Sequence, residues 1–557
     1  MLRDKNQPRR IIPRWQPSAL ASSAAGFSSL KKTQAHTARA ADAKGTAFQA
    51  FFEERNLGSA SEALSEAILE RNVEAATHVA TYILQNKSRA PAPLLRLAGD
   101  AMASRGSAAE ILPPPSIGDV AHWRSMLKIS PNNPAVWADM ARHYSSLGDK
   151  KQALRCMKTA LQLAPNHRWM LRTASRLLIH QEDSAAAHKL LANHPRTKSD
   201  PWLMAAELAC AHIAGKAPKS WKTANEALRF DRFPAAHISE LATAVGMMEL
   251  EGGQRKQARK LVQRALVAPT ENTLAQVLWA KEAKHLGDGI PSLDGLISAR
   301  GDAFEAAYRI QLKRGDVQDA LKACLHWGGD EPFAARPRVE ATFVASLLDD
   351  HSLVDRSVDE ALRIDGKLSL PLELNQLFAK LSSGQFLLQD ADSVLKTELR
   401  LRALIDIGGP VSIHATANLA LLNYRSGNFE LGKDLYRKAI DMARKIEGFE
   451  SAALAATFAA REAILAGVAG CETLLEEAIQ LAERAGSEPA SFYNRKLQAL
   501  IAAPEHAALI LSPSSATQYL KPMKILSVSK DKRGFVLTVG RNGTPASFQN
   551  MLSTVLN

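Results

Sequence analysis

Residues 133–165 read NPAVWADMARHYSSLGDKKQALRCMKTALQLAP, and this stretch decides the fold. Apolar and small residues recur three and four positions apart on both sides of the Gly-Asp pair at 148–149, which predicts two helices joined by a tight turn. Pro165 then ends the second helix. Ala141 and Ala153 are small enough to let two antiparallel helices approach closely. The stretch therefore predicts a helical hairpin.

The hairpin resembles a tetratricopeptide repeat (TPR), a unit of about 34 residues with a characteristic set of small, aromatic and turn residues. The signature positions are Trp137, Met140, Ala141, Tyr144, Gly148, Asp149, Ala153, Met157, Ala160 and Pro165. In this family successive helix pairs stack into a right-handed superhelix with a concave groove. The resemblance implies a chain that presents a surface to other macromolecules.

The same spacing returns at residues 168–195, 301–332 and 335–366, and in longer copies from Ile413 onward. We expect about nine to eleven helix pairs over residues 46–500, an all-α solenoid of TPR type. The predicted parts are a disordered basic arm (1–45), degenerate helical repeats (46–112), an N-terminal TPR-like lobe (113–286), a C-terminal TPR-like lobe (287–503) and a tail with a β-hairpin (504–557). The hairpin is predicted from KILSVS and FVLTVG, two short strand-like runs around a turn.

The amino-acid composition indicates the fold class and the cellular compartment. Aromatic residues make up only 6% of the chain, which favours closely packed helices over a β-rich fold. No run approaches the roughly 18 apolar residues that span a bilayer. The four cysteines are far apart and form no CxxC pair, which predicts reduced thiols in the cytoplasm. They are Cys156, Cys210, Cys324 and Cys471.

The net charge of +13 is unevenly distributed. Residues 1–45 hold nine Lys or Arg against two Asp, a net charge of +7, whereas the other 512 residues carry +6. A basic arm of this kind often contacts nucleic acid or acidic proteins. Its candidate polyanion-binding residues are Arg9, Arg10, Arg14 and Trp15. A mitochondrial transit peptide is the alternative, although three prolines within the first 17 residues oppose its amphipathic helix.

The sequence contains no phosphate-binding loop, dinucleotide fingerprint, HExxH or GxSxG motif, so we expect no enzyme activity and no cofactor. His180, His188 and His194 are predicted to lie on a solvated face rather than around a metal ion. The acidic pair Asp349 and Asp350 is predicted to cap a helix rather than to act in catalysis.

A more specific binding hypothesis concerns basic residues on the predicted inner helices. Their spacing from the signature predicts that they face the groove, where they would hold an acidic peptide or a nucleic-acid backbone; a solvated helix face is the alternative. These residues are Arg142, Arg172, Arg176, Arg309, Lys313, Asn418 and Arg425. We therefore predict a non-catalytic scaffold or adaptor that holds partner proteins through its groove and non-repeat ends, possible partners being an acidic segment or an enzyme. The alternative is a nucleic-acid-binding accessory subunit acting through the basic arm and groove.

Overall fold

The structure is a computed structural model of the 557-residue chain. It describes residues 47–69, 72–102, 119–230, 233–282, 286, 290–383, 391–502, 524–531, 534–541 and 544–546. The predicted basic arm, with Arg9, Arg10, Arg14 and Trp15, lies outside the described residues.

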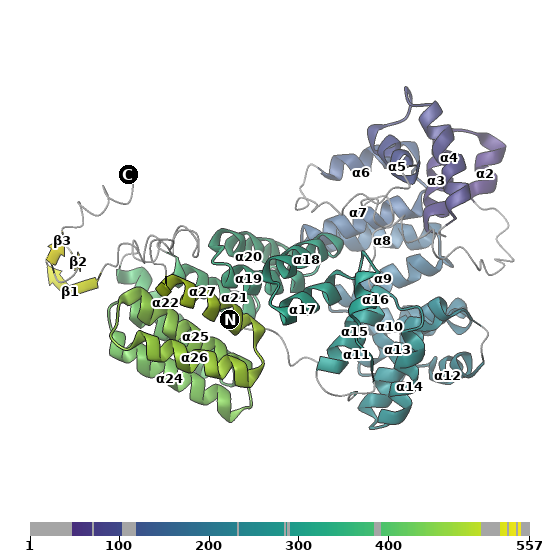
Figure 1. The fold of residues 1–557 in the computed structure, drawn as a ribbon. Helices are drawn as coiled ribbons and strands as arrows, with labels where there is room; N and C mark the ends of the chain where they lie inside the picture. Colours follow the sequence, from purple (N-terminus) through teal and green to yellow (C-terminus); the bar gives the residue numbers. More distant parts are fainter. Residues whose placement is uncertain are drawn as a thin grey trace.

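The described chain is helical from Ala47 to Ala502, in agreement with the predicted all-α solenoid (Figure 1). It begins with a group that we call the N-terminal helices: α2 (Ala47–Glu54), α3 (Leu57–Leu69), α4 (Val73–Gln85), α5 (Ala92–Met102) and α6 (Asp119–Ile129). Successive members contact one another, and α6 packs on α7.

The next helices form what we call the first stack. It contains α7 (Pro134–Ser146), α8 (Lys150–Leu163), α9 (Arg168–His180), α10 (Ser184–Ala192), the 3₁₀ turn η1 (Pro195–Lys198), α11 (Pro201–Ile213), α12 (Trp221–Arg229), α13 (Ala235–Glu251), α14 (Arg255–Ala265) and α15 (Glu271–Glu282). The odd-numbered helices contact one another along the inner side, while α8, α10, α12 and α14 lie outside. The predicted repeat is confirmed here, because α7 and α8 pack as a pair with Ala141 and Ala153 fully buried.

After the short α16 (Asp294–Ser298), a second group follows that we call the closed stack. Its members are α17 (Phe304–Arg314), α18 (Val317–Asp330), α19 (Arg336–Leu347), α20 (His351–Asp365), α21 (Leu370–Ser382), α22 (Ala391–Asp406), α23 (Gly409–Arg425), α24 (Phe429–Lys445), α25 (Phe449–Ala466), α26 (Cys471–Ala485) and α27 (Glu488–Ala502). Helix α15 contacts α17, so the packing continues across the predicted boundary between the two lobes at 286–287.

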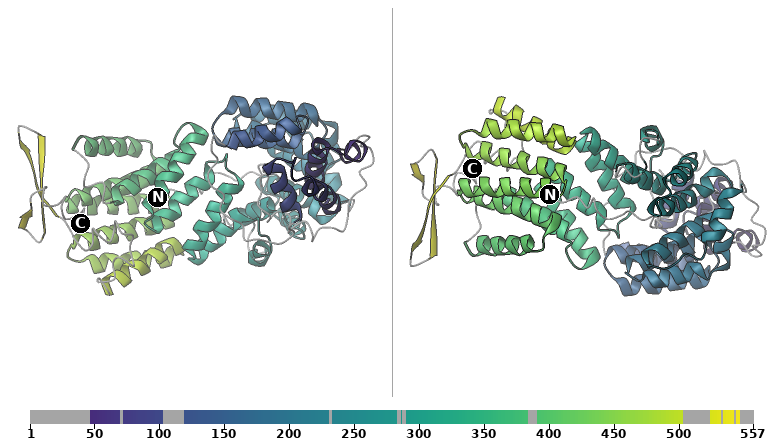
Figure 2. Two further views of the ribbon diagram at one scale, coloured as in Figure 1. Left: turned by 90° about the horizontal axis from the view of Figure 1, so that it is seen from above. Right: turned by 90° about the horizontal axis from the view of Figure 1, so that it is seen from below.

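The closed stack returns on itself. Its last helix, α27, packs against α17, and in Figure 2 the lime helices at its end lie against the teal helices at its start. Aromatic rings from three inner helices meet inside, with ring centroids 4.8 Å apart for Phe378 and Phe458 and 5.1 Å apart for Phe458 and Tyr493. The inner face of this stack is therefore filled by its own side chains.

The two stacks meet at the turn between α18 and α19. Arg338 holds this turn by donating hydrogen bonds to the carbonyls of Gly328, Glu331 and Ala334 at 3.1–3.2 Å. The turn presents Phe333, which is fully buried within the apolar cluster of the first stack. On the other side, Gly148 in the α7–α8 turn has φ +76° and lies so close to Arg363 that a Cβ would meet its carbonyl oxygen at 2.2 Å.

Beyond α27 the described residues include three short strands: β1 (Lys524–Asp531), β2 (Gly534–Arg541) and β3 (Thr544–Ala546). They pair antiparallel in the order β1-β2-β3.

Candidate partner-binding site

A hydrogen-bonded asparagine joins the N-terminal helices to the first stack. Asn133 is fully buried and precedes α7, and its side-chain oxygen accepts from the backbone nitrogen of Ala135 at 3.0 Å. Its amide nitrogen donates to Ser65 Oγ on α3 at 2.9 Å. Because one side chain both caps α7 and binds α3, the sequence that starts the repeat also fixes the position of the preceding helices.

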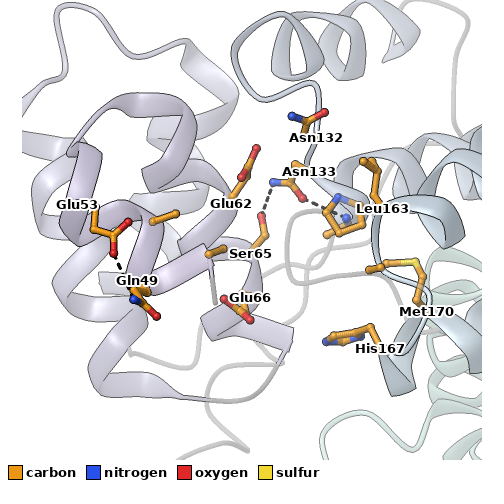
Figure 3. Close-up of a pocket in the computed structure, with 15 residues that line it drawn as sticks. Gln49, Glu53, Glu62, Ser65, Glu66, Asn132, Asn133, Leu163, His167 and Met170 are labelled. Carbon is orange, nitrogen blue, oxygen red and sulfur yellow. Dashed lines mark hydrogen bonds between the residues drawn. The ribbon is translucent and has the colours of Figure 1, made fainter. Parts of the chain in front are cut away.

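A cavity of about 380 Å³ opens beside this contact, and we call it the N-terminal pocket (Figure 3). One wall comes from α2 and α3 and carries the carboxylates of Glu53, Glu62 and Glu66. The opposite wall comes from the turns before α7 and α9 and includes Asn132 and His167. The pocket therefore lies where two helical units meet and is acidic on one side.

The electrostatics of the pocket favour a cationic guest. Burial raises the pKa of Glu62, and the nearby Glu54 carboxylate raises it further. Burial lowers the pKa of His167 to about 4, with added repulsion from Arg196 and Arg168, so this imidazole is neutral at pH 7. The acidic wall could therefore take a bound ammonium or guanidinium group, while Arg196 and Arg168 place positive charge beside the neutral His167 on the opposite wall.

The predicted groove arginines of the first stack are engaged with the chain itself. Arg142 donates to the backbone carbonyls of Gly329 and Asp330. Arg176 lies 5.0 Å from the ring centroid of Phe333. The structure thus brings these two side chains together around the turn that joins the stacks.

The third of these arginines, Arg172, is 2% exposed and forms an ion pair with Glu240. It also stacks on Trp202, with its guanidinium carbon 4.2 Å from the ring centroid. Glu240 receives further hydrogen bonds from Trp202 Nε1 at 3.2 Å and Asn272 at 3.3 Å. This group holds the inner helices α9, α11, α13 and α15 together.

The predicted groove residues of the closed stack also make contacts within the chain, with one exception. Arg309 pairs with Glu282, and Arg425 pairs with Glu462 at 2.8 Å. Asn418 is buried and donates to the carbonyl of Leu374 at 2.9 Å. Lys313 alone among the seven residues is exposed. An acidic ligand could reach the others only by displacing contacts within the chain.

Sequence reasoning missed the acidic partners of these arginines. Each lies on an inner helix, and its partner is between 27 and 68 residues away in the chain, beyond the reach of local spacing. A usable signal was present, because a single acid within an apolar helical run is seldom left unpaired. Glu240 in AAHISELATAVG and Glu462 in FAAREAILA both fit that pattern.

The prediction that all three clustered histidines lie on a solvated face was wrong for His180, which packs beside the buried Phe333, and for His188. The His188 side chain is buried, and its Nε2 lies 2.9 Å from Glu207 Oε1. Glu207 is fully buried within the apolar α11 and also accepts from the backbone nitrogens of Lys219 and Ser220. The buried carboxylate needs these donors, which explains why the histidine faces inward.

Capping by the acidic pair at 349–350 is confirmed for one residue and wrong for the other. Asp350 precedes α20 and accepts from the backbone nitrogen of Leu353 at 3.0 Å. Asp349 is instead buried, with φ +59°, and accepts from Tyr493 at 2.7 Å and from Lys496 at 2.7 Å. Because both donors lie on α27, Asp349 fastens the end of the closed stack to its beginning.

Arg461 occupies the centre of this buried network. Its guanidinium donates to Glu462 at 2.7 Å and to Ser382 at 2.9 Å, and lies 3.8 Å from Asp349. Burial opposes its charge, but the carboxylates of Glu462 and Asp349 outweigh that penalty and raise the pKa of Arg461. Arg461, Glu462 and Asp349 therefore form a buried ion cluster within the closed stack.

Three further properties of the described residues bear on chemistry. Within the described ranges, no group of three or more His, Cys, Asp or Glu side chains is arranged to hold a metal ion. None of the helices described here is long and apolar enough to cross a membrane. All four cysteines are free thiols, and burial raises the pKa of Cys156 to about 11 and that of Cys210 to about 12, which makes both unreactive.

Comparison with known families agrees with the geometry of α7 and α8. A family model described as tetratricopeptide repeat matches residues 134–167. The match covers one helix pair, α7 and α8. In this family stacked helix pairs form extended surfaces for protein partners. A search of curated proteins finds no match.

Solved structures that match this chain include yeast Tom70, at 14% identity over 79% of this chain and 99% of that chain, with a TM-score of 0.26. Another is the APC/C hetero-tetramer Cut9-Hcn1, at 11% identity over 81% of this chain and 91% of that chain, with a TM-score of 0.29. A third is Naa15/Naa10 bound to HypK, at 13% identity over 83% of this chain and 78% of that chain, with a TM-score of 0.22.

Proposed function

We propose that this TPR protein is a non-catalytic, cytoplasmic scaffold or adaptor that holds a partner protein at its N-terminal pocket. The observation that carries the proposal is the acidic cavity between α2–α3 and α7–α9, where Glu53, Glu62 and Glu66 share one wall. A cavity of about 380 Å³ is large enough for one or two long side chains and too small for a folded element.

The partner that fits this cavity is a basic segment presenting Lys or Arg. An ammonium or guanidinium group donates several hydrogen bonds and has no acceptor, so it suits a wall of carboxylates. The predicted acidic partner depended on groove arginines such as Arg172, Arg309 and Arg425, which pair with Glu240, Glu282 and Glu462. Charge complementarity therefore favours a basic partner over an acidic one.

Two labelled peptides test this proposal by fluorescence anisotropy on the full chain. They have the same length and differ only in carrying Lys and Arg, or Glu, at every second position. The wild type should bind the basic peptide at least about tenfold more tightly, and the double variant Glu62→Gln/Glu66→Gln should lose that preference.

The control removes two exposed glutamates from another helix, as Glu476→Gln/Glu477→Gln on α26. Its affinity for the basic peptide should match that of the wild type. Equal loss in both double variants would mean that the peptide binds any acidic surface. Tighter binding of the Glu-containing peptide by the wild type would reject the proposed partner chemistry.

A further inference from the structure

Helix α14 has an unusual charge distribution for an outer helix of a stack. It carries five basic residues and no acidic residue in eleven positions, RKQARKLVQRA. The buried side consists of Ala258, Leu261, Val262 and Ala265, and all five basic residues lie on the remaining half of the helix. These residues, Arg255, Lys256, Arg259, Lys260 and Arg264, define what we call the α14 surface.

A second outer helix provides an internal comparison. Helix α24 also carries five basic residues, but three acidic residues are interleaved with them in FELGKDLYRKAIDMARK. Two pairs face each other there: Arg437 lies 3.7 Å from Asp434, and Arg444 lies 3.9 Å from Asp441. Helix α24 neutralises part of its own charge, whereas α14 has no acid with which to do so.

The cations of the α14 surface are of two kinds. Arg259 and Arg264 donate to the carbonyls of Leu286 and Leu228, which holds them in place. Arg255, Lys256 and Lys260 are exposed and make no hydrogen bond or ion pair with any residue that the structure describes. Three side chains are thus available to an external anion.

Fold stability does not account for this placement. Arg255 and Lys256 occupy the first turn of α14, where the helix dipole favours acidic residues and disfavours basic ones. The residue before the helix, Gln254, makes no side-chain capping hydrogen bond. The basic first turn therefore opposes helix formation, and a binding role would explain it.

Exposed apolar side chains lie at the other end of the row. The hydrogen bond from Arg264 to Leu228 brings the end of α14 to the end of α12, and Figure 1 shows the two helices close together. Phe230, directly after α12, is 53% exposed, and Val267, two residues after α14, is 70% exposed. Cations followed by an exposed aromatic ring match the requirements of single-stranded nucleic acid, whose phosphates need positive charge and whose bases stack on rings.

We propose that the α14 surface binds single-stranded nucleic acid, with Arg255, Lys256 and Lys260 on the phosphates and Phe230 against a base. This activity lies beyond the protein scaffold proposed above and uses a different part of the first stack. It needs neither the basic arm nor the inner arginines.

The test measures binding of a labelled 20-nucleotide oligo(dT) to the full chain by anisotropy between 50 and 300 mM salt. In the double variant Lys256→Glu/Lys260→Glu the affinity at 100 mM salt should fall at least about tenfold. The slope of log affinity against log salt should decrease by about 1.4, since each lost phosphate contact removes about 0.7 for a single strand. The melting temperature should stay within about 2 °C of the wild type, because a Glu in the first turn suits the helix dipole.

The matched control is Lys433→Glu/Lys438→Glu on α24, which makes the same change of net charge and should bind as the wild type. Phe230→Ala should weaken binding without changing the salt slope. Unchanged affinity in the α14 variant, or equal loss in the α24 control, would overturn the proposal. So would competition by a poly-Glu peptide as effective as that by unlabelled oligo(dT), because the surface would then be selecting acidic protein rather than bases and phosphates.

Discussion

The first stack and the closed stack are built from the same kind of helix pair but place their charged side chains differently. In the closed stack α27 returns to α17, and the charges of Asp349, Arg461 and Glu462 are paired inside. The first stack also pairs Arg172 with Glu240 on its inner side, but it leaves a basic outer helix, α14, and adjoins an acidic pocket. The difference indicates that repeat architecture alone does not create a binding groove, because a superhelix that closes uses its inner face for its own packing.

Removing the central cation of the closed stack should have the largest effect. Arg461→Met leaves the buried carboxylates of Asp349 and Glu462 without their shared partner, so we expect a loss of about 3–5 kcal/mol in unfolding free energy. Urea titration followed by circular dichroism measures it. Arg444→Met, on the exposed side of α24, should change stability by less than about 0.5 kcal/mol. Similar values for the two variants would mean that Arg461 is not buried as described.

A paired glycine experiment tests the contact between the stacks. Gly148 and Gly366 both have positive φ, +76° and +71°, so alanine at either position costs about 1–2 kcal/mol of backbone strain. Only at position 148 would the new Cβ meet a backbone atom, the Arg363 carbonyl oxygen at 2.2 Å, whereas position 366 has open space. Gly148→Ala should therefore be less stable than Gly366→Ala by a further ~1–3 kcal/mol in urea denaturation. Equal losses would show that the stacks do not touch here.

Low pH should weaken the contact between the two stacks near His180 and Phe333. Burial, aided by repulsion from Arg176 and Lys150, lowers the pKa of His180 to about 4, from about 6.5 in the unfolded chain. The folded state therefore holds fewer protons, and this stabilising contribution is complete above about pH 6.5 and is lost as the pH falls toward 4. His180 lies beside Phe333, with ring centroids 5.6 Å apart.

Replacing His180 by Gln should remove part of that pH dependence, up to about 3 kcal/mol of the stability lost between pH 6.5 and 4. Denaturation curves at half-unit pH intervals provide the measurement. Because His351 in the closed stack also has a pKa lowered to about 4 by burial, some acid sensitivity should remain. A variant with the wild-type pH profile would show that His180 does not titrate in this way.

The last of these effects concerns packing within the first stack. Ala141 and Ala153 are fully buried between α7 and α8, so Leu at either position should cost about 1–3 kcal/mol through overpacking. Lys158→Leu, on the exposed side of α8, should be within about 0.5 kcal/mol of the wild type. Unchanged thermal unfolding in both alanine variants would contradict the assigned register.

The two stacks also differ in how much of their structure could be predicted from the sequence. The repeat at 134–167 was predictable because helix pairing depends on local spacing, and small residues such as Ala141 mark the close approach. The return of the closed stack on itself could not be predicted, because Tyr493 contacts Asp349 across 144 residues and no local pattern encodes that contact. For the same reason the inner arginines were predicted to be open to ligands, although acids such as Glu240 and Glu462 now pair with them.

Hydrogen exchange with mass spectrometry can show whether partners are held by the N-terminal pocket rather than by the inner face of the closed stack. The full chain is compared with and without a saturating basic peptide. We expect slower exchange at residues 47–66 and 132–170 and unchanged exchange at residues 304–502. Slower exchange confined to residues 304–502 would contradict this expectation.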